Sequence, residues 1–297
     1  MPAVIEPPDD VSRRRVARRK FLKRATLAAG GGFLLAAYSG LIEPNKIDIK
    51  NLEIRIQRLP GTFDGFKIAL LSDLHFGPYT GAREIGAAVN AVNALRPHMV
   101  ALLGDFVSHP IIGSVKTASR KAEPCAQLLG TLRSRLGSFA ILGNHDVSTE
   151  AEFVADALKS HGISLLRNES HAIEQDGARL WVIGADDALF TGLRVDTVVA
   201  QVPKQEAKIL LVHEPDVADD ATKLGIDVQF SGHSHGGQVR APGIRPPYLP
   251  PMGSKYYDGY YRVGSMQLYT NRGLGTVGVP FRFFCPPEIT LVTLRTS

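Results

Sequence analysis

The stretch Phe66–His75, FKIALLSDLH, joins an apolar run directly to two residues that can bind a metal ion. Its first part, 66–71, is largely apolar, which is typical of a strand buried on both faces of a sheet. Asp73 and His75 follow where that strand would end. Because side chains alternate along extended backbone, these two side chains are expected on the same side of it. The stretch therefore predicts a buried strand that presents two ligands at its carboxyl end.

Four further motifs of this kind each follow a strand-like apolar run. They are Gly104-Asp105, Gly143-Asn144-His145-Asp146, His213-Glu214 and Gly232-His233-Ser234-His235-Gly236. Ligand sites in open α/β sheets form beyond the carboxyl ends of strands, so we expect all five motifs to converge. Imidazoles bind zinc, iron and manganese, and carboxylates favour harder ions, so the set predicts a mixed oxygen and nitrogen site for divalent metals. The glycines leave room where backbone passes close to the ions.

The non-functional interpretation is that these motifs are ordinary turns, because Asp-Gly and Asn-His pairs are common in turns. The five motifs use five of the nine histidines and each stands at a strand end, which turns do not explain. The remaining histidines differ. We interpret His98, His161 and His171 as structural and leave His109 open between the rim of the site and a loop.

Strand and helix patterns alternate through the rest of the chain. Apolar residues from Ile85 to Leu95 recur at helical spacing, and Thr149 resembles the N-cap of another helix. An Asp176-Gly177 turn predicts a hairpin over residues 171–183. The runs 52–56, 99–103, 139–142, 209–212, 228–230 and 289–294 predict strands, and the proline-rich segment 240–253 predicts an irregular surface loop. This alternation predicts an α/β fold, with one mixed sheet or two sheets stacked between helices.

The positive charge of the chain is confined to its amino-terminal part. The net charge is +5, but residues 1–40 hold eight Lys/Arg and three acids, which leaves 26 basic and 26 acidic residues in the rest. A nuclease or another nucleic-acid partner is therefore not expected, because tracking phosphates needs a basic surface. The two cysteines, Cys125 and Cys285, are better explained as buried thiols than as a disulfide.

The amino-terminal segment is predicted to be an export signal or a membrane anchor. Arg18-Arg19-Lys20-Phe21-Leu22-Lys23 resembles a bacterial twin-arginine signal, which the twin-arginine export machinery reads, and the apolar stretch 25–42 follows it. About 18 residues is short for a membrane span, which needs roughly 20. Ala37-Tyr38-Ser39 offers a small-x-small cleavage pattern. We predict a signal peptide or membrane anchor over 1–42 and a catalytic domain over 43–297, in the periplasm or held at the membrane.

In their order, the motifs resemble the calcineurin-like metallophosphoesterase superfamily over roughly residues 66–238. The resemblance implies a four-layer α/β/β/α sandwich of two mixed sheets flanked by helices, with two divalent ions (Mn, Zn or Fe) in each chain. It implies that Asp73, His75, Asp105 and His235 hold one ion and that Asp105, Asn144, His213 and His233 hold the other. It further implies that His145 faces the substrate and protonates the leaving oxygen, with Asp146 as its orienting partner.

The carboxyl-terminal part resembles a bacterial exported or membrane-associated phosphodiesterase branch of that superfamily. The resemblance rests on 235–238, on 269–275 and on Pro280, Arg282 and 286–288. It implies a phosphodiesterase or phosphatase in which a metal-bridging hydroxide attacks phosphorus in line with the leaving group. Arg272 and Arg282 are candidate ligands for a phosphate oxygen, and a packing role is open for both.

Two alternatives differ in chemistry. The first is a UDP-2,3-diacylglucosamine-type lipid pyrophosphate hydrolase at the membrane, as some relatives of that branch are. The tyrosines in or beside the proline-rich segment would then contact the lipid, or would equally serve as core: Tyr248, Tyr256, Tyr257, Tyr260 and Tyr261. The second is a non-catalytic metal-binding module of the envelope, which the intact His145 argues against.

Overall fold

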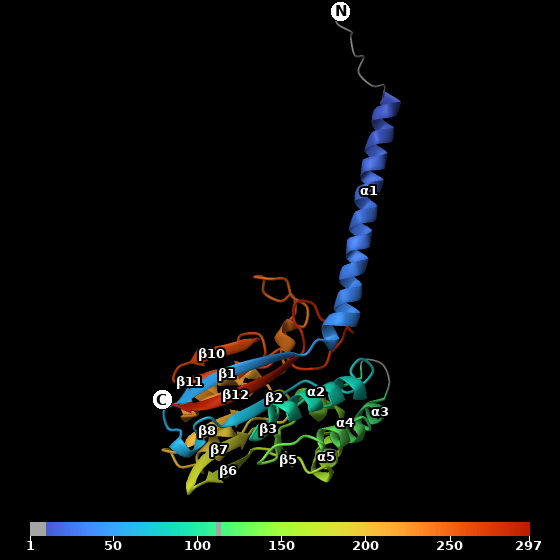
Figure 1. Cartoon of the computed structure of the whole chain (residues 1–297). Helices are drawn as coiled ribbons and strands as arrows, with labels where there is room; N and C mark the ends of the chain where they lie inside the picture. Colours follow the sequence, from blue (N-terminus) through green and yellow to red (C-terminus); the bar gives the residue numbers. More distant parts are fainter. Residues whose placement is uncertain (1–9, 111–113) are drawn as a thin grey trace, which may run out of the picture.

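Two six-stranded sheets stack face to face between helices, and one long helix projects from the domain that they form (Figure 1). The computed structural model describes residues 10–110 and 114–297. The strands that precede the candidate site motifs lie inside these sheets, so their carboxyl ends are fixed by pairing on both sides.

The first sheet has the order β1-β12-β2-β3-β4-β5. Its strands are β1 Asp48–Ile56, β12 Glu288–Thr296, β2 Lys67–Leu71, β3 Met99–Leu102, β4 Ser138–Ala140 and β5 Ser164–Leu165. All neighbours are parallel except β12 and β2, so the sheet is mixed. The last strand of the chain thus lies between the first two, which ties both ends of the domain together.

The second sheet has the order β10-β11-β9-β8-β7-β6. Its strands are β10 Gly259–Val263, β11 Met266–Thr270, β9 Val228–Ser231, β8 Ala207–Leu211, β7 Ala178–Gly184 and β6 Glu169–Gln175. The two outer pairs are antiparallel and the inner pairs are parallel. The β6–β7 pair is the hairpin expected around Asp176-Gly177, whose residues have φ of 50° and 77°.

Three apolar layers hold the sheets and helices together. Side chains such as Leu70 and Phe230 fill the space between the sheets. The outer face of the first sheet packs on α2 (Ala82–Leu95), α4 (Ala122–Leu129) and α5 (Asn144–Ser160). The outer face of the second packs on the short helices α6 (Val195–Val199) and α7 (Ala218–Ala221). The short helix α3 (Val115–Ser119) lies beside α5. This confirms the four-layer α/β/β/α sandwich.

Helix α5 begins earlier than the sequence predicted. It starts at Asn144, and the Asp146 carboxylate accepts a hydrogen bond of 3.0 Å from the Gly143 N–H at its amino end. The expected N-cap Thr149 lies inside the helix, next to a kink at Glu150 (φ −167°, ψ 87°). The Gly143-Asn144-His145-Asp146 motif therefore forms the first turn of α5 rather than a loop before it.

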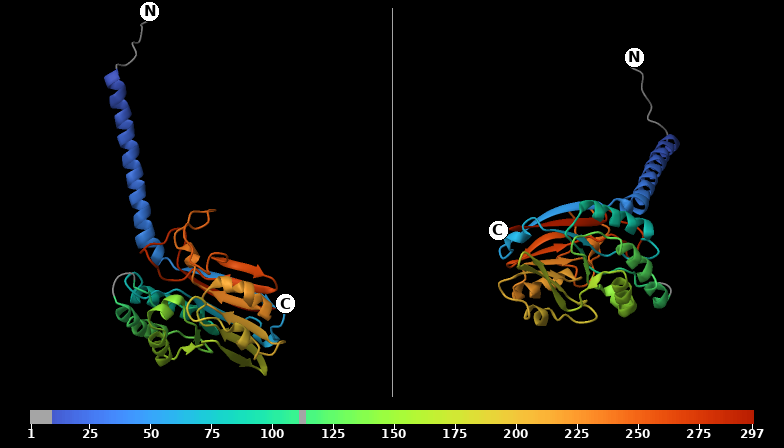
Figure 2. Two further views of the ribbon diagram at one scale, coloured as in Figure 1. Left: turned by 180° about the vertical axis from the view of Figure 1, so that it is seen from behind. Right: turned by 60° about the horizontal axis from the view of Figure 1, so that its bottom comes forward.

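Helix α1 (Asp10–Ala37) continues through Tyr38–Ile42 and Glu43–Asn45 to the edge of the domain. It extends away from both sheets in all three views (Figure 2). Ser39 and Glu43 are buried against the domain. The helical segment therefore runs through the boundary expected at residues 42 and 43. Cys125 and Cys285 are both free and buried, as predicted.

Candidate functional site

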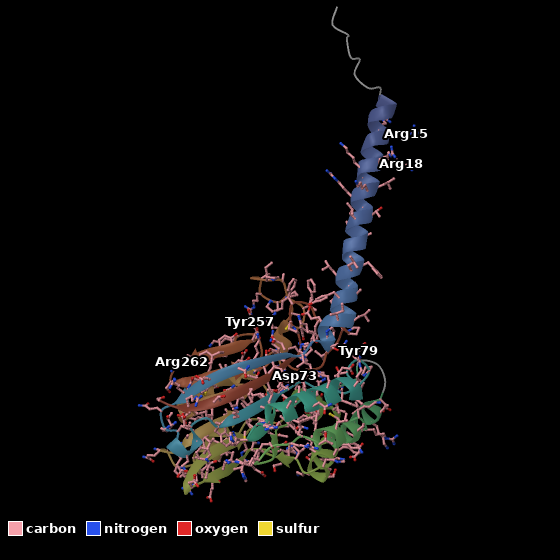
Figure 3. The ribbon with its side chains drawn as sticks, in the orientation of Figure 1. Arg15, Arg18, Asp73, Tyr79, Tyr257 and Arg262 are labelled. Atoms are coloured by element: carbon pink, nitrogen blue, oxygen red, sulfur yellow. The ribbon has the colours of Figure 1, made fainter. Side chains whose placement is uncertain are left out.

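The candidate metal ligands come together at the carboxyl ends of four strands and the first turn of α5. Asp73 and His75 follow β2, Asp105 follows β3, His213 follows β8, and His233 and His235 follow β9. Asn144 is the first residue of α5. In Figure 3, Asp73 lies inside the domain, whereas Arg15 and Arg18 lie far away along α1. These two arginines of the amino-terminal helix therefore contribute nothing to this site.

One group of donor atoms surrounds the ends of β2 and β9. His75 Nε2 and His235 Nε2 lie 2.9 Å apart, and their rings stack with centroids 4.8 Å apart. Asp73 Oδ1 lies 3.4 Å from His235 Nε2. Asp105 Oδ2 lies 3.5 Å from His75 Nε2. Two imidazoles and two carboxylates thus point at one small volume.

A second group shares Asp105 with the first. Asp105 Oδ2 lies 3.2 Å from His213 Nε2. Asn144 Oδ1 lies 2.9 Å from His233 Nδ1. The outer nitrogens of both histidines are fixed by backbone carbonyls, at 2.6 Å between His213 Nδ1 and Leu103 O and at 2.8 Å between His233 Nε2 and Pro251 O. Such contacts fix ring orientation and tautomer, so His213 Nε2 and His233 Nδ1 are the nitrogens left for an ion.

The chemistry of these donors fits divalent metal ions. Burial lowers the pKa of His75 to about 3 and that of His233 to about 4, and it lowers that of His235 well below its usual value. The three rings are therefore neutral near pH 7, which is the form that binds metals. His213 Nε2 and His75 Nδ1 are buried without a hydrogen-bond partner. Buried polar atoms are costly to leave unpaired, and an ion would satisfy His213 Nε2.

The remaining charges show a site that favours added positive charge. Burial raises the pKa of Asp73 to about 6, although His213 opposes the rise. Burial alone would also raise the pKa of Asp105, but the imidazoles of His213 and His145 hold it well below its usual range. Burial opposes protonation of His213, yet Asp105 and Asp73 raise its pKa well above the ordinary value. A cation beside these buried carboxylates would stabilise their charged forms, and bound metal ions would provide it.

Five of the seven candidate ligands have left-handed backbone, which non-glycine residues rarely adopt. They are Asp73, His75, Asp105, His233 and His235, with φ between 47° and 69°. Strain of this kind persists where the surrounding structure enforces it and is concentrated at functional sites. Neighbouring glycines permit the close approach: a Cβ on Gly143 would lie 2.3 Å from Asp105 Oδ1, and one on Gly232 would lie 2.5 Å from Asp73 Oδ2.

Asp146 supports the Asp105 segment rather than His145. Its Oδ2 accepts from the N–H of Asp105 (2.8 Å) and Gly143 (3.0 Å). Its Oδ1 accepts from the N–H of Phe106 (2.8 Å) and Val107 (3.1 Å). The role expected from the sequence, orienting the His145 ring, is therefore replaced by a structural one. The carboxylate joins the start of α5 to the backbone that follows β3.

His145 is oriented by a residue that the sequence left open. The N–H of His109 donates to His145 Nδ1 at 2.8 Å. The His109 ring itself contacts the Ser148 carbonyl at 3.1 Å and faces no candidate ligand. The His145 N–H in turn donates to Asp105 Oδ1 at 2.8 Å. Because Nδ1 accepts, a neutral His145 ring carries its proton on Nε2.

The two candidate substrate arginines are both engaged within the protein. Arg272 Nε pairs with Glu288 Oε2 at 2.5 Å, and its Nη2 pairs with Asp48 Oδ2 at 2.9 Å. Arg282 is fully buried, and its guanidinium donates to the carbonyls of Gly275, Cys285, Arg272 and Gly273. Arg282 Nη2 also lies 3.4 Å from His235 Nδ1. Both guanidinium groups are thus held by protein partners rather than left free beside the cavity.

A cavity of about 540 Å³ opens beside the candidate ligands. Asp105, Asn144, His145, His233 and His235 line its inner part. Its outer walls are mostly apolar: Leu189, Val239, Pro247, Tyr248, Pro250, Pro251, Val277 and Val279. The sequence had pointed to this wall only through Tyr248 and the prolines of 240–253; Leu189, Val239, Val277 and Val279 were missed. A second cavity of about 510 Å³ reaches His145 from the side of Tyr79 and His109.

Comparisons with known proteins agree with this arrangement. The chain is 32% identical to YkuE, an uncharacterised metallophosphoesterase of Bacillus subtilis, over 96% of this chain and 99% of that protein. It is 29% identical to the phosphodiesterase YaeI of Escherichia coli, over 94% of this chain and 99% of that protein. It is 31% identical to a transmembrane protein with a metallophosphoesterase domain from Danio rerio, over 89% of this chain and 61% of that protein. The family model for calcineurin-like phosphoesterases matches residues 66–237, and the chain is therefore a member of the calcineurin-like phosphoesterase family, a hydrolase of phosphoester bonds.

Proposed function

We propose that the chain is a two-metal phosphodiesterase, with Asp105 bridging the two ions. The proposal rests on one observation. Asp105 Oδ2 lies between two separate donor groups, 3.5 Å from His75 Nε2 and 3.2 Å from His213 Nε2. Asp73 and His235 would complete one ion's ligands, and Asn144 and His233 the other's. The imidazole-rich set favours manganese, iron or zinc over magnesium or calcium.

The protein's own residues would position the ester and handle the proton. Bound ions would supply polarisation of the phosphoryl oxygens and a lowered pKa for the attacking water. The His145 ring lines the cavity with Nδ1 held by the His109 N–H, which leaves the Nε2 proton available for the leaving oxygen. The T-shaped contact between the His145 and His75 rings, with centroids 4.7 Å apart, holds His145 beside the first donor group.

The cavity walls favour an ester with an apolar substituent. Tyr248, Val279 and several prolines line the outer part, and the described lining contains no Lys or Arg. A nucleic-acid strand would need basic side chains along its phosphates, so a nuclease is disfavoured. The same walls favour a second candidate substrate, a lipid-linked pyrophosphate. The two differ in the size of the apolar group, and both use the same donor atoms.

The amino-terminal helix supports a location at or across a membrane. The segment 18–45 has a mean hydropathy of 1.5 over its best window and is long enough to span a bilayer. The pair Arg18-Arg19 stands at the start of this segment, ahead of its apolar part 25–42, as in twin-arginine export signals. We propose export of the domain by that machinery, with α1 as either a removed signal or a retained anchor.

The test is hydrolysis by the full chain in detergent, stripped of metal and refilled with manganese, zinc or iron. A bis-aryl phosphodiester and an aryl phosphomonoester are compared for the parent, Asp105→Ala and His145→Ala. We expect metal-dependent turnover with the diester preferred. Asp105→Ala should lose turnover and bound metal together. His145→Ala should keep its metal and lose turnover by about 10²–10⁴-fold, as is typical for a general acid.

His161→Ala is the matched control, because His161 pairs with Glu123 at 2.8 Å, away from the site. It should keep parental turnover and metal content. Full activity and two bound ions in Asp105→Ala would sink the bridging assignment. One ion per parent chain at saturation would sink the two-metal proposal while leaving the family membership unaffected.

A further inference from the structure

Exposed apolar side chains gather on two loops that flank the cavity. One loop, 240–253, exposes Ile244 (67%) and Tyr248 (72%). The other, 276–286, exposes Val279 (39%), Phe281 (37%) and Phe284 (51%). We name these five side chains the apolar rim. Contiguous exposed apolar surface of this kind marks contact with a partner or a membrane.

Backbone N–H groups of the loop 276–286 donate hydrogen bonds to the end of the amino-terminal helical segment. The Arg282 N–H donates to the Ser39 carbonyl at 3.0 Å, and the Cys285 N–H donates to Glu43 Oε1 at 2.5 Å. The Arg240 N–H donates to the Phe283 carbonyl at 2.9 Å, which connects the two loops. The loop 240–253 rises from the domain on the side from which α1 emerges (Figures 1 and 2). These contacts attach the loops that carry the rim to the end of the amino-terminal helical segment.

The position of α1 favours a membrane over a protein partner as the surface that the rim contacts. A helix that spans a bilayer must end at the interface, because the hydrocarbon layer takes only about 20 helical residues. Leu41 and Ile42, in the last turns of this helical segment, are themselves 73% and 55% exposed. The rim lies beside this end, at the level that lipid headgroups would occupy. Aromatic side chains favour that level, because it accepts both their apolar faces and their polar edges.

The charges on these loops suit a lipid surface. No Asp or Glu occurs in residues 232–257 or 273–287. Arg245, between Ile244 and Tyr248, is exposed and donates to the Ser254 carbonyl at 2.9 Å. Anionic headgroups attract such a segment, and a carboxylate that would repel them is missing from its sequence. Among the other tyrosines near the loop, Tyr256 and Tyr261 are half-buried and their rings pack edge to face, with centroids 5.2 Å apart.

We propose that the apolar rim contacts the lipid bilayer and holds the mouth of the cavity at the headgroup layer. Tyr248 and Val279 belong both to the rim and to the cavity wall, so this docking would leave the cavity open toward the membrane surface. The inference is independent of the proposed reaction and rests on the proposed retention of α1 as a membrane anchor. It concerns how the domain sits on the bilayer, whichever ester it hydrolyses.

Tryptophan reporters in the full chain test the proposal. The chain has a single tryptophan, Trp181 on β7, whose emission is subtracted as background. Phe284→Trp and Ile244→Trp place reporters on the rim, and Phe153→Trp places a matched exposed aromatic on α5. Leu34→Trp on α1 reports insertion. The proteins are reconstituted into phosphatidylcholine and phosphatidylglycerol vesicles with or without brominated acyl chains, and bound protein is isolated by flotation.

We expect brominated lipid to quench Leu34→Trp strongly and the two rim reporters about twofold, as for side chains at the acyl boundary. Phe153→Trp should be unchanged. Rim reporters that stay unquenched while Leu34→Trp is quenched would overturn the proposal, since the domain would then stand away from the bilayer. A concentration-dependent blue shift of the rim reporters in detergent without lipid would also overturn it and assign the rim to contact between copies of the chain.

Discussion

Replacing Arg272 distinguishes a packing arginine from a substrate ligand. Arg272 contacts Glu288 Oε2 at 2.5 Å and Asp48 Oδ2 at 2.9 Å, with 8% of its side chain exposed and only 2% of that of Glu288. Arg272→Met keeps the side-chain bulk and leaves the Glu288 charge buried without its cation. Breaking a buried pair in this way costs about 3–5 kcal/mol. At roughly 2–4 °C per kcal/mol for a domain of this size, Tm should fall by about 6–20 °C.

Thermal unfolding of the metal-loaded chain in detergent measures this loss, and KM for the aryl phosphodiester is measured well below the lowered Tm. A packing role predicts a large fall in Tm with KM unchanged. Arg262→Met is the control, because Arg262 is exposed on β10 and its loss should cost less than about 0.5 kcal/mol (Figure 3). An unchanged Tm together with a raised KM would refute the packing role and restore Arg272 as a phosphate ligand.

Three further changes probe the site. Gly143→Ala places a Cβ 2.3 Å from Asp105 Oδ1, so the carboxylate must shift. Metal affinity should then fall by about 10–100-fold in a metal titration. Unchanged affinity would show that the segment adapts without moving the ligand. Asp146→Asn replaces one carboxylate oxygen by an amide NH₂, so two of the four backbone N–H groups lose their acceptor. The free energy of unfolding, measured by urea titration, should fall by about 2–6 kcal/mol. A stability within about 1 kcal/mol of the parent would contradict this account. Ions that bind only the folded chain stabilise it by mass action, so Tm should fall with the logarithm of the free metal concentration as a chelator removes metal. A Tm that does not depend on free metal would argue against ions held by these buried ligands.

The strands around the site were predictable because they are buried on both faces. Residues 68–71 and 99–102 form continuous apolar runs, and a ligand motif follows closely after each. Strands β10 and β11 escaped prediction. Residues 259–263 alternate between half-buried and exposed positions up to the buried Val263, beside a proline-rich loop. They form the edge strand of the second sheet, and they pair with β11, which in turn pairs with the inner strand β9. That pairing is not visible in the local sequence.

The start of α5 shows how a tertiary contact overrides a local pattern. Thr149 before an apolar stretch favours an N-cap, but the Asp146 carboxylate binds four N–H groups from two segments and moves the start of the helix to Asn144. The same contact removes Asp146 from the role expected beside His145. Residue spacing in the sequence does not predict that the Asp146 carboxylate accepts hydrogen bonds from the backbone that follows β3.

The sequence by itself determined the fold class, the family and the identity of the candidate ligands, because those depend on apolar periodicity and on donor residues placed at strand ends. Tertiary structure alone decided how the donors divide around Asp105, which carbonyls orient His213 and His233, and that Arg272 and Arg282 face protein partners. It also placed the apolar loops beside the end of α1. These features depend on distances between segments far apart in the chain, which residue order does not encode locally.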